Sequence, residues 1–184
     1  MFILLGIGAG LIAGLVRGGS FDSLRALSFR LVPLALVGLV AQVVLFADPV
    51  ATAVSDAIGR LVYTASTAAV FVALLANVGI TGVPLVATGA SLNLLAIVAN
   101  GGVMPADPAA VTTAGIVSDD AFSNSAIVAD PVLVPLTDIF AVPAELPFAN
   151  VFSIGDVLIA VGIAWTIGAA MTRGHESERP LPPA

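Results

Sequence analysis

The sequence contains no cysteine and no lysine, and its single histidine, His175, lies in a polar C-terminal stretch. Without cysteine there is no disulfide, no thiolate nucleophile and no cysteine-ligated metal site. A single histidine also excludes a histidine-rich metal site. Charge is scarce too, because only 10 % of the 184 residues are Asp, Glu, Lys or Arg. Soluble domains carry about a quarter of such residues, so this chain cannot cover a water-facing surface with charge.

Apolar residues take the place of the missing charge. They make up 59 % of the chain, and the mean hydropathy is +1.11. The net charge of -6 argues against nucleic acid as a partner, because nucleic-acid binding needs a basic surface. The sequence also shows no Ser/His/Asp or metal-ligand constellation. We therefore expect no metal and no other cofactor, and an enzyme is the least favoured of the function classes.

Five apolar runs are long enough to consider as membrane spans, and in each one the hydrophobic residues surround the helix axis. They are Met1–Val16, Leu31–Phe46, Leu61–Val78, Pro84–Asn100 and Ser153–Met171. The shorter runs reach about 24–27 Å, slightly less than a hydrocarbon core of about 30 Å, so flanking residues must help to cover the core. No basic residue precedes the first run, which predicts a retained helix and not a signal peptide. The runs predict an all-α fold, an integral membrane bundle of five transmembrane helices that forms one domain over residues 1–171.

Arginine placement predicts the orientation of this bundle, because arginine is enriched in cytoplasmic loops. With the N-terminus outside, five of the six arginines fall on the cytoplasmic side and only Arg60 falls outside. The tail, residues 172–184, is then cytoplasmic, and its polar, proline-ended sequence predicts disorder. Residues 101–152 form a long outer loop without a basic residue. These features predict a multi-pass protein of the plasma membrane, with its N-terminus outside and its C-terminus inside.

The cytoplasmic connection Arg17–Arg30 is predicted to lie along the membrane surface. Phe21 and Leu24 can face the acyl chains, while Arg25 and Arg30 extend to the lipid head groups. This segment therefore makes the lipid bilayer itself a partner of the protein.

The outer loop divides into a polar half and a proline-rich half. The polar half, Met104–Ala126, is expected to be solvated, and Asp107-Pro108 is typical of a helix N-cap. The second half has prolines at 131, 135, 143 and 147, a density that excludes a regular spanning helix. Lipid would leave its backbone unsatisfied, so we expect it at the outer interface or between the helices, over the outer end of the last span. The acids of the loop are Asp107, Asp119, Asp120, Asp130, Asp138 and Glu145.

The first apolar run repeats glycine every four residues. These glycines are Gly6, Gly10, Gly14 and Gly18. A line of small residues with this spacing lets another helix approach closely. The approaching helix belongs either to the same bundle or to another molecule, so a homo-oligomer or a membrane partner protein stays open.

Amides inside the apolar runs are the first candidates for a polar site. Asn93 and Asn100 fall on one helical face, and Gln42 lies on another run. Lipid offers them no hydrogen-bond partner, so they point into the bundle. They either line a polar cavity or form interhelical hydrogen bonds worth well under about 2 kcal/mol each. The Asn100-Gly-Gly sequence also predicts a helix C-cap, because glycine readily takes the left-handed conformation.

Asp156 lies near the start of the last apolar run. The spacing Ser153-x-x-Asp156 is that of a capping box, in which each residue bonds the backbone N–H of the other. The helix dipole also favours a negative charge there, by about 0.3–1 kcal/mol. The alternative is a proton or cation site at the outer face, formed by Asp156 with Asp138 and Arg60. The candidate polar site is therefore Gln42, Asn93, Asn100, Asp138 and Asp156, and the capping interpretation stays open beside it.

Three stretches stand out together: NGGVMP at Asn100–Pro105, LTDI at Leu136–Ile139 and VFSIGDVL at Val151–Leu158. With Asn93 before them, they resemble the NGG-x-MP and VFSIGDVL signatures of a family of small, multi-pass prokaryotic membrane proteins. That family is catalogued as a domain of unknown function, with no biochemical activity assigned. The resemblance implies a membrane fold and draws attention to Asn93, Asp138 and the capping sequence, but it implies no reaction.

The sequence favours two classes of function. A non-enzymatic membrane protein that acts as an accessory or partner-binding subunit is favoured. The alternative is a small transporter or ion- or proton-coupled carrier with a polar site near the outer face. A carrier needs a continuous polar path across the bilayer, and none is visible in the third run or in the inner half of the fifth.

Overall fold

The computed structural model describes residues 1–116 and 125–176, and these residues are mostly helical. The long helices are α1 (Phe2–Val16), α2 (Val32–Leu45), α4 (Asp56–Leu75), α5 (Val83–Ala99) and α7 (Ile154–Glu176). The short helices are η1 (Asp22–Ala26), α3 (Val50–Ala53), α6 (Pro108–Thr113) and η2 (Val134–Leu136). The strands are β1 (Met104–Pro105), β2 (Ser125–Ala126), β3 (Phe140–Val142) and β4 (Asn150–Phe152).

Each predicted apolar run overlaps one long helix, but the bounds of two helices differ clearly from the prediction. α4 begins at Asp56 and not at Leu61, because Ser55 takes the extended conformation of an N-cap just before it. It also stops short of Val78. α7 continues to Glu176, so residues 172–176 belong to a helix and not to a disordered tail. The rest of the predicted tail, 177–184, lies outside the described residues.

Helix length separates the five apolar helices into two groups. By length and composition, α4 and the Ile154–Arg173 part of α7 could cross a membrane. α1, α2 and α5 are also apolar, but they have 15, 14 and 17 residues. Those lengths correspond to about 21–26 Å of helix, which is short of a hydrocarbon core of about 30 Å. The structure thus shows a mostly helical protein with two helices of spanning length.

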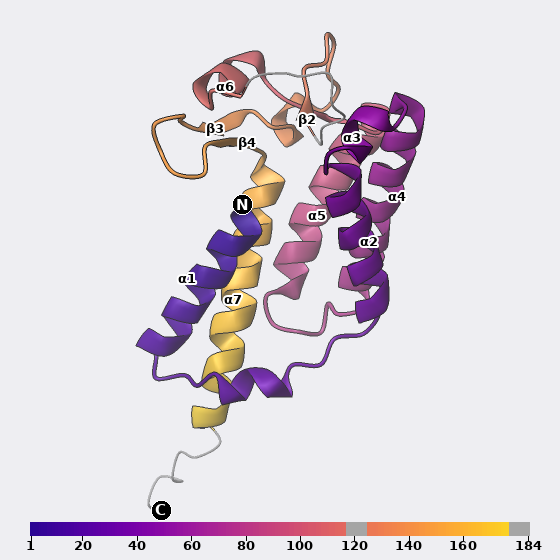
Figure 1. Cartoon of the computed structure of the whole chain (residues 1–184). Coiled ribbons are helices and arrows are strands. Elements are labelled where there is room, and N and C mark those ends of the chain that lie inside the picture. The colour runs from indigo at the N-terminus through magenta and orange to yellow at the C-terminus, as the bar shows by residue number, and fades with distance from the viewer. Residues whose placement is uncertain (117–124, 177–184) are drawn as a thin grey trace, which may run out of the picture.

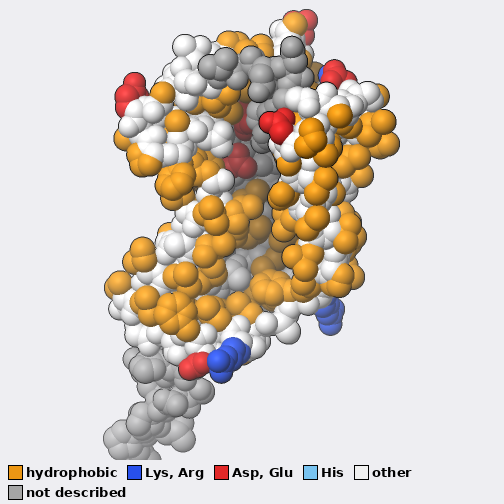
Figure 2. All heavy atoms as spheres, viewed as in Figure 1, with side chains coloured by type: hydrophobic (Ala, Val, Ile, Leu, Met, Phe, Trp, Pro, Cys, Tyr) orange, Lys and Arg blue, Asp and Glu red, His pale blue; other side chains and the backbone are white. Residues whose placement is uncertain are grey.

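The long helices pack as a row in the order α1, α7, α5, α4 and α2. Figure 1 shows α1 alongside α7 and α2 alongside α4, with α5 between the two pairs. In the space-filling view the face between the pairs is hollowed and its walls are mainly hydrophobic (Figure 2). The row places the N-terminus at the same end as the loop 101–152, and α7 ends at the opposite end.

The glycine line of the first helix is the surface on which α1 meets α7. Its buried members are Gly6, Gly10 and Gly14. A Cβ atom at Gly6 would lie 2.6 Å from the carbonyl oxygen of Ala160, so only glycine permits this approach. Gly18 does not belong to the line, which corrects the predicted set: it follows the C-cap Arg17, and its φ of 77° makes the turn out of the helix. The line therefore has a partner helix within the same chain.

The described residues of the predicted outer loop, 101–116 and 125–152, fold over one end of the helices, and we call them the cap (Figure 1). Its β1 pairs in parallel with β2, and its β3 pairs antiparallel with β4, which leads directly into α7. η2, in the proline-rich half, contacts both α5 and α7. The proline-rich half therefore packs over the end of the last helix, as predicted, but short strands that the prolines did not indicate organise it.

The described residues of the polar half, 104–116 and 125–126, bury one face of the segment, which corrects the expectation that it is solvated throughout. Ala106, Ala110 and Ala114 are buried in one cluster with Val151 of β4. The predicted N-cap is present, because the Asp107 carboxylate accepts hydrogen bonds from the N–H groups of residues 109 and 110, at 2.8 and 3.1 Å. Small alanines allow this close packing, although the segment is polar on average. Asp119 and Asp120 lie outside the described residues.

Candidate functional site

A cluster of three polar side chains lies where α5 meets the start of α7, directly under the cap. Asn93 Nδ2 of α5 donates a hydrogen bond to Asp156 Oδ1 of α7 at 2.9 Å. Ser153 Oγ lies 2.8 Å from Asn93 Oδ1 and 3.1 Å from Asp156 Oδ2, so its one proton can bond either oxygen. Ser153 is 0 % exposed. The cluster joins two helices through groups that satisfy one another.

Ser153 and Asp156 also exchange hydrogen bonds in the manner of a capping box. The Ser153 N–H donates to Asp156 Oδ2 at 3.0 Å, and the Asp156 N–H donates to Ser153 Oγ at 3.1 Å. These bonds satisfy backbone donors that would otherwise lack partners at the start of a helix. The spacing of the two residues indicates this pairing, but it gives no sign that Asn93 joins the pair from another helix.

Two glycines allow the backbones to come close at this cluster. A Cβ on Gly155 of α7 would meet the Asn93 side chain and would lie 2.8 Å from the carbonyl oxygen of Gly89 on α5. A Cβ on Gly89 would lie 3.0 Å from the side chain of Ile159. The short distance between the helices lets Asn93 reach Asp156. Gly89 shares a helical face with Asn93, whereas no pattern in the sequence singles out Gly155.

Asp138, the second acid at this end, is 4 % exposed in the cap. Its backbone is fixed on both sides, because its N–H donates to the carbonyl of Pro105 at 2.9 Å and its carbonyl accepts from the N–H of Asp107 at 3.0 Å. Its Oδ2 accepts a hydrogen bond from Ser125 Oγ at 2.5 Å. Burial raises the pKa of Asp138 from 3.8 to about 6; the Ser125 bond opposes this rise, and the charge of Asp156 adds to it.

The two acids have no cationic partner in the part of the chain that the structure describes. The ion pair found there joins Arg25 to Asp22 in η1, at 3.3 Å. Arg60, the cation expected beside the acids, instead directs its guanidinium toward the carbonyl oxygen of Gly101, at 3.5 Å. The described side chains, those of residues 1–116 and 125–173, include no group of three suited to hold a metal ion. The arrangement can bind a proton and offers hydrogen-bond acceptors, and the hydroxyls of Ser153 and Ser125 are held by the carboxylates of Asp156 and Asp138.

Asn100 lies apart from the cluster and fastens the cap to α5. Its Nδ2 donates to the carbonyl of Val132 at 2.9 Å, and its Oδ1 accepts from the Val132 N–H at 2.8 Å. Gly101 follows with a φ of 69°, and the Gly102 N–H donates to the carbonyl of Ile97 at 2.9 Å. These bonds form the glycine C-cap that the NGG sequence predicts.

Gln42 is also separate, since its Nε2 donates to Thr67 Oγ1 at 3.2 Å and joins α2 to α4. Of the five candidates, the structure brings Asn93 and Asp156 together and leaves Gln42 and Asn100 elsewhere. Asp156 lies close enough to Asp138 for its charge to raise the pKa of Asp138. Ser125, which approaches Asp138 from β2, is not among the residues predicted from the sequence. No signal could have found it, because the contact depends on the fold of the cap.

A model of a family of unknown function, DUF5317, matches residues 26–168. The chain belongs to this family. No curated protein and no solved structure matches the chain. The DUF5317 region includes the Asn93–Ser153–Asp156 cluster, Asp138 and the Asn100 contact, so every part of the candidate site lies inside it.

The hydrogen bonds of the Asn93–Ser153–Asp156 cluster predict that different substitutions of Asp156 lower the stability by different amounts. Asp156→Asn keeps an oxygen acceptor and should lower the free energy of unfolding by about 1 kcal/mol, whereas Asp156→Leu leaves buried donors unpaired and should lower it by about 3 kcal/mol. Denaturant or thermal unfolding of the two variants, followed by the fluorescence of the single tryptophan, measures the difference. Equal losses would contradict a hydrogen-bonding role for the carboxylate.

Proposed function

We propose that the protein is a multi-pass integral membrane protein with five spans and no enzymatic activity, which acts as an accessory or partner-binding subunit. The observation that carries this proposal is the apolar surface of its helices. Six large apolar side chains on the described helices are 65 % or more exposed: Leu4, Ile12 and Val16 of α1, Val37 and Val43 of α2, and Leu61 of α4. Water disfavours such extensive apolar exposure, whereas lipid matches it.

Charge segregation supports an orientation with the cap outside and the C-terminus in the cytoplasm. The described arginines at the end opposite the cap are Arg17, Arg25, Arg30 and Arg173. The cap end carries the larger share of the acids, and Figure 2 shows acidic side chains gathered there. This is the distribution expected when the arginine-rich end faces the cytoplasm. The short helices α1, α2 and α5 then require a thin bilayer or flanking apolar residues.

The polar cluster fits a structural role better than a catalytic one. Asn93, Ser153 and Asp156 bond one another, and so they hold α5, α7 and the base of the cap together. The cap also exposes apolar side chains between β3 and β4, with Leu146 at 54 % and Phe148 at 70 %. Exposed apolar groups on an outer loop suit contact with another membrane protein. The geometry therefore best supports a partner-binding function, in which a rigid helix bundle presents this cap to another protein.

One observation favours the alternative, a proton- or cation-coupled carrier. Asp138 is buried without a cationic partner among the described residues, and its pKa is raised to about 6. An ionisable group in such a position is typical of a proton-linked site. On the inner half of α7 the hydroxyls of Thr166 and Thr172 donate to carbonyls of their own helix, which weighs against a continuous polar path.

Cysteine labelling tests the proposed topology, because the chain has no cysteine of its own. Glu145→Cys places an exposed thiol on the cap, and Ser28→Cys places one at the arginine-rich end. In intact cells, a membrane-impermeant maleimide should label the first variant and should reach the second only after permeabilisation. The cysteine-free chain is the control. Labelling of the Ser28→Cys variant from outside, or of both variants in a soluble fraction, would overturn the proposal.

A further inference from the structure

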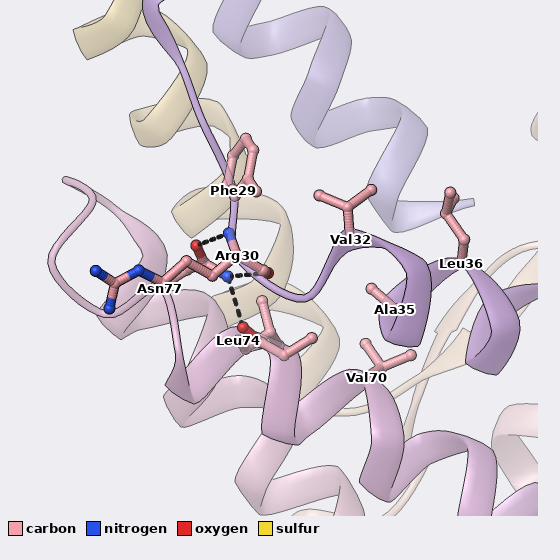
Figure 3. A pocket seen from close by; sticks show the side chains of 9 residues that line it. Phe29, Arg30, Val32, Ala35, Leu36, Val70, Leu74 and Asn77 are labelled. Atoms are coloured by element: carbon pink, nitrogen blue, oxygen red, sulfur yellow. Dashed lines mark hydrogen bonds between the residues drawn. The ribbon is translucent and has the colours of Figure 1, made fainter.

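An apolar pocket of about 230 Å³ lies between α2 and α4, at the end of the helices opposite the cap. Its apolar walls are Phe29, Val32, Ala35, Leu36, Val70 and Leu74. Figure 3 shows side chains of the two helices around this space, with the Arg30 side chain extending away from them at the rim. The pocket therefore combines an apolar interior with a cation at its edge.

The polar groups at the rim are already satisfied by one another. Asn77 Oδ1 accepts from the Arg30 N–H at 2.7 Å, and Asn77 Nδ2 donates to the carbonyls of Arg30 and Ala73, at 2.9 and 2.7 Å. These bonds hold the Arg30 backbone in place and leave its guanidinium exposed. An occupant of the pocket would consequently meet hydrocarbon inside and a positive charge outside.

The charge of Arg30 at the rim of the pocket selects an anionic occupant. Arg30 forms no ion pair with any described residue, and Asp22, an acid at the same end of the protein, is already paired with Arg25. Basic pockets between helices at the cytoplasmic face are typical sites for anionic lipid head groups. Long arginine side chains also reach the head-group level from a backbone at the membrane boundary.

The volume of the pocket favours a lipid acyl chain over a protein helix as its occupant. At about 30 Å³ for each water-sized group, the pocket holds roughly eight such groups, a length of alkyl chain. A helix with its side chains has a diameter of about 10–12 Å and does not fit. We propose that the pocket binds one acyl chain of an anionic phospholipid of the inner leaflet, whose phosphate group contacts Arg30; this inference rests on the proposed membrane topology.

Titration of the purified full-length protein in a nonionic detergent tests the proposal with two probes, phosphatidylglycerol and phosphatidylcholine of the same acyl chains. Native mass spectrometry counts the bound lipid, and the melting temperature reports its effect. We expect one saturable site that prefers phosphatidylglycerol. Arg30→Gln should weaken that binding about fivefold and remove the preference, while the backbone bonds to Asn77 stay. Ala35→Phe should fill the pocket and abolish binding of both lipids.

Arg17→Gln is the matched control, because Arg17 lies at the same end of the protein but does not line the pocket. It should bind phosphatidylglycerol as the unmodified chain does. Phosphatidylglycerol with a photoreactive group in its acyl chain should cross-link to peptides covering residues 29–36 and 70–77, a readout that does not depend on the folding of Ala35→Phe.

Three outcomes would overturn the proposal. They are equal binding of the two lipids, cross-links spread evenly over all helices, and an Ala35→Phe effect on self-association without an effect on lipid. If Ser28→Cys shows the expected sidedness while any of these occurs, the lipid site alone fails. If the labelling itself fails, the membrane topology fails with it.

Discussion

Gly155→Ala is expected to destabilise the protein by about 3 kcal/mol or more, although it adds a single methyl group. The new Cβ would meet the Asn93 side chain and would lie 2.8 Å from the Gly89 carbonyl oxygen. Because backbone cannot move aside as a flexible side chain does, α5 and α7 would have to separate. Separation would also break the Asn93–Asp156 hydrogen bond, which is 2.9 Å long. The loss should be visible as a lower yield of folded protein and a lower melting temperature.

Gly8→Ala is the matched control for this prediction. It makes the same chemical change within α1, where an added Cβ would have nothing within 4 Å. Alanine is favoured over glycine in a helix by about 0.5–1 kcal/mol, so this variant should be as stable as the unmodified protein or slightly more stable. Equal melting temperatures for the Gly155→Ala and Gly8→Ala variants would show that the close approach of α5 and α7 is wrong.

Asp138→Asn is expected to stabilise the protein at neutral pH and to remove a pH dependence that the unmodified chain should show. The pKa of Asp138 is 3.8 before folding and about 6 in the buried site, so the folded state holds its proton more tightly. A raised carboxyl pKa means that stability falls as the pH rises from about 4 to about 6, and then levels off. The full difference corresponds to about 3 kcal/mol.

The measurement is the free energy of unfolding of both proteins from pH 4 to pH 8. Asparagine keeps an oxygen that can accept the Ser125 hydrogen bond, so the variant should follow a flatter curve that lies above that of the parent at pH 7. Asp22→Asn is the control, because Asp22 is exposed and far from the cap. Parallel curves for the Asp138→Asn variant and the parent would show that Asp138 is not buried with a raised pKa.

The same pair of proteins separates the two proposed functions. In sealed vesicles with a pH gradient, a proton-coupled carrier should dissipate the gradient at a rate that Asp138→Asn abolishes. A non-enzymatic partner-binding protein should leave the gradient intact with either aspartate or asparagine at this position. A gradient that decays equally with both variants would exclude Asp138 as the coupling group.

Local features of the fold could be predicted from the sequence because they depend on neighbouring residues. The NGG turn after α5, the Asp107 N-cap and the spacing of Ser153 and Asp156 each use residues within a few positions of one another. The glycine line of α1 was also visible as a period of four. Its last member, Gly18, was misplaced, since periodicity alone does not show where a helix ends.

Long-range contacts could not be predicted in the same way. Asn93 and Ser153 are sixty residues apart, and only the packing of α5 on α7 brings them together. The alanines of the cap predict a solvated segment when the sequence is taken alone. They are buried only because Val151 of β4, which lies far along the chain, packs against them. Ser125 and Asp138 likewise meet through the strand pairing of the cap. In each case a tertiary contact decides the position, and a single sequence carries no record of it.

Asn77 and Asn100, at opposite ends of the bundle, make the same kind of hydrogen bonds. The Asn77 amide faces the backbone of Arg30 and the Asn100 amide faces the backbone of Val132, and each presents one donor and one acceptor to a single residue. An asparagine side chain thus substitutes for the peptide group of a missing neighbouring strand. Irregular backbone that packs against helices needs partners inside the protein for its N–H and C=O groups. These two side chains supply such partners at either end of the bundle, and so they hold non-helical segments against the helices.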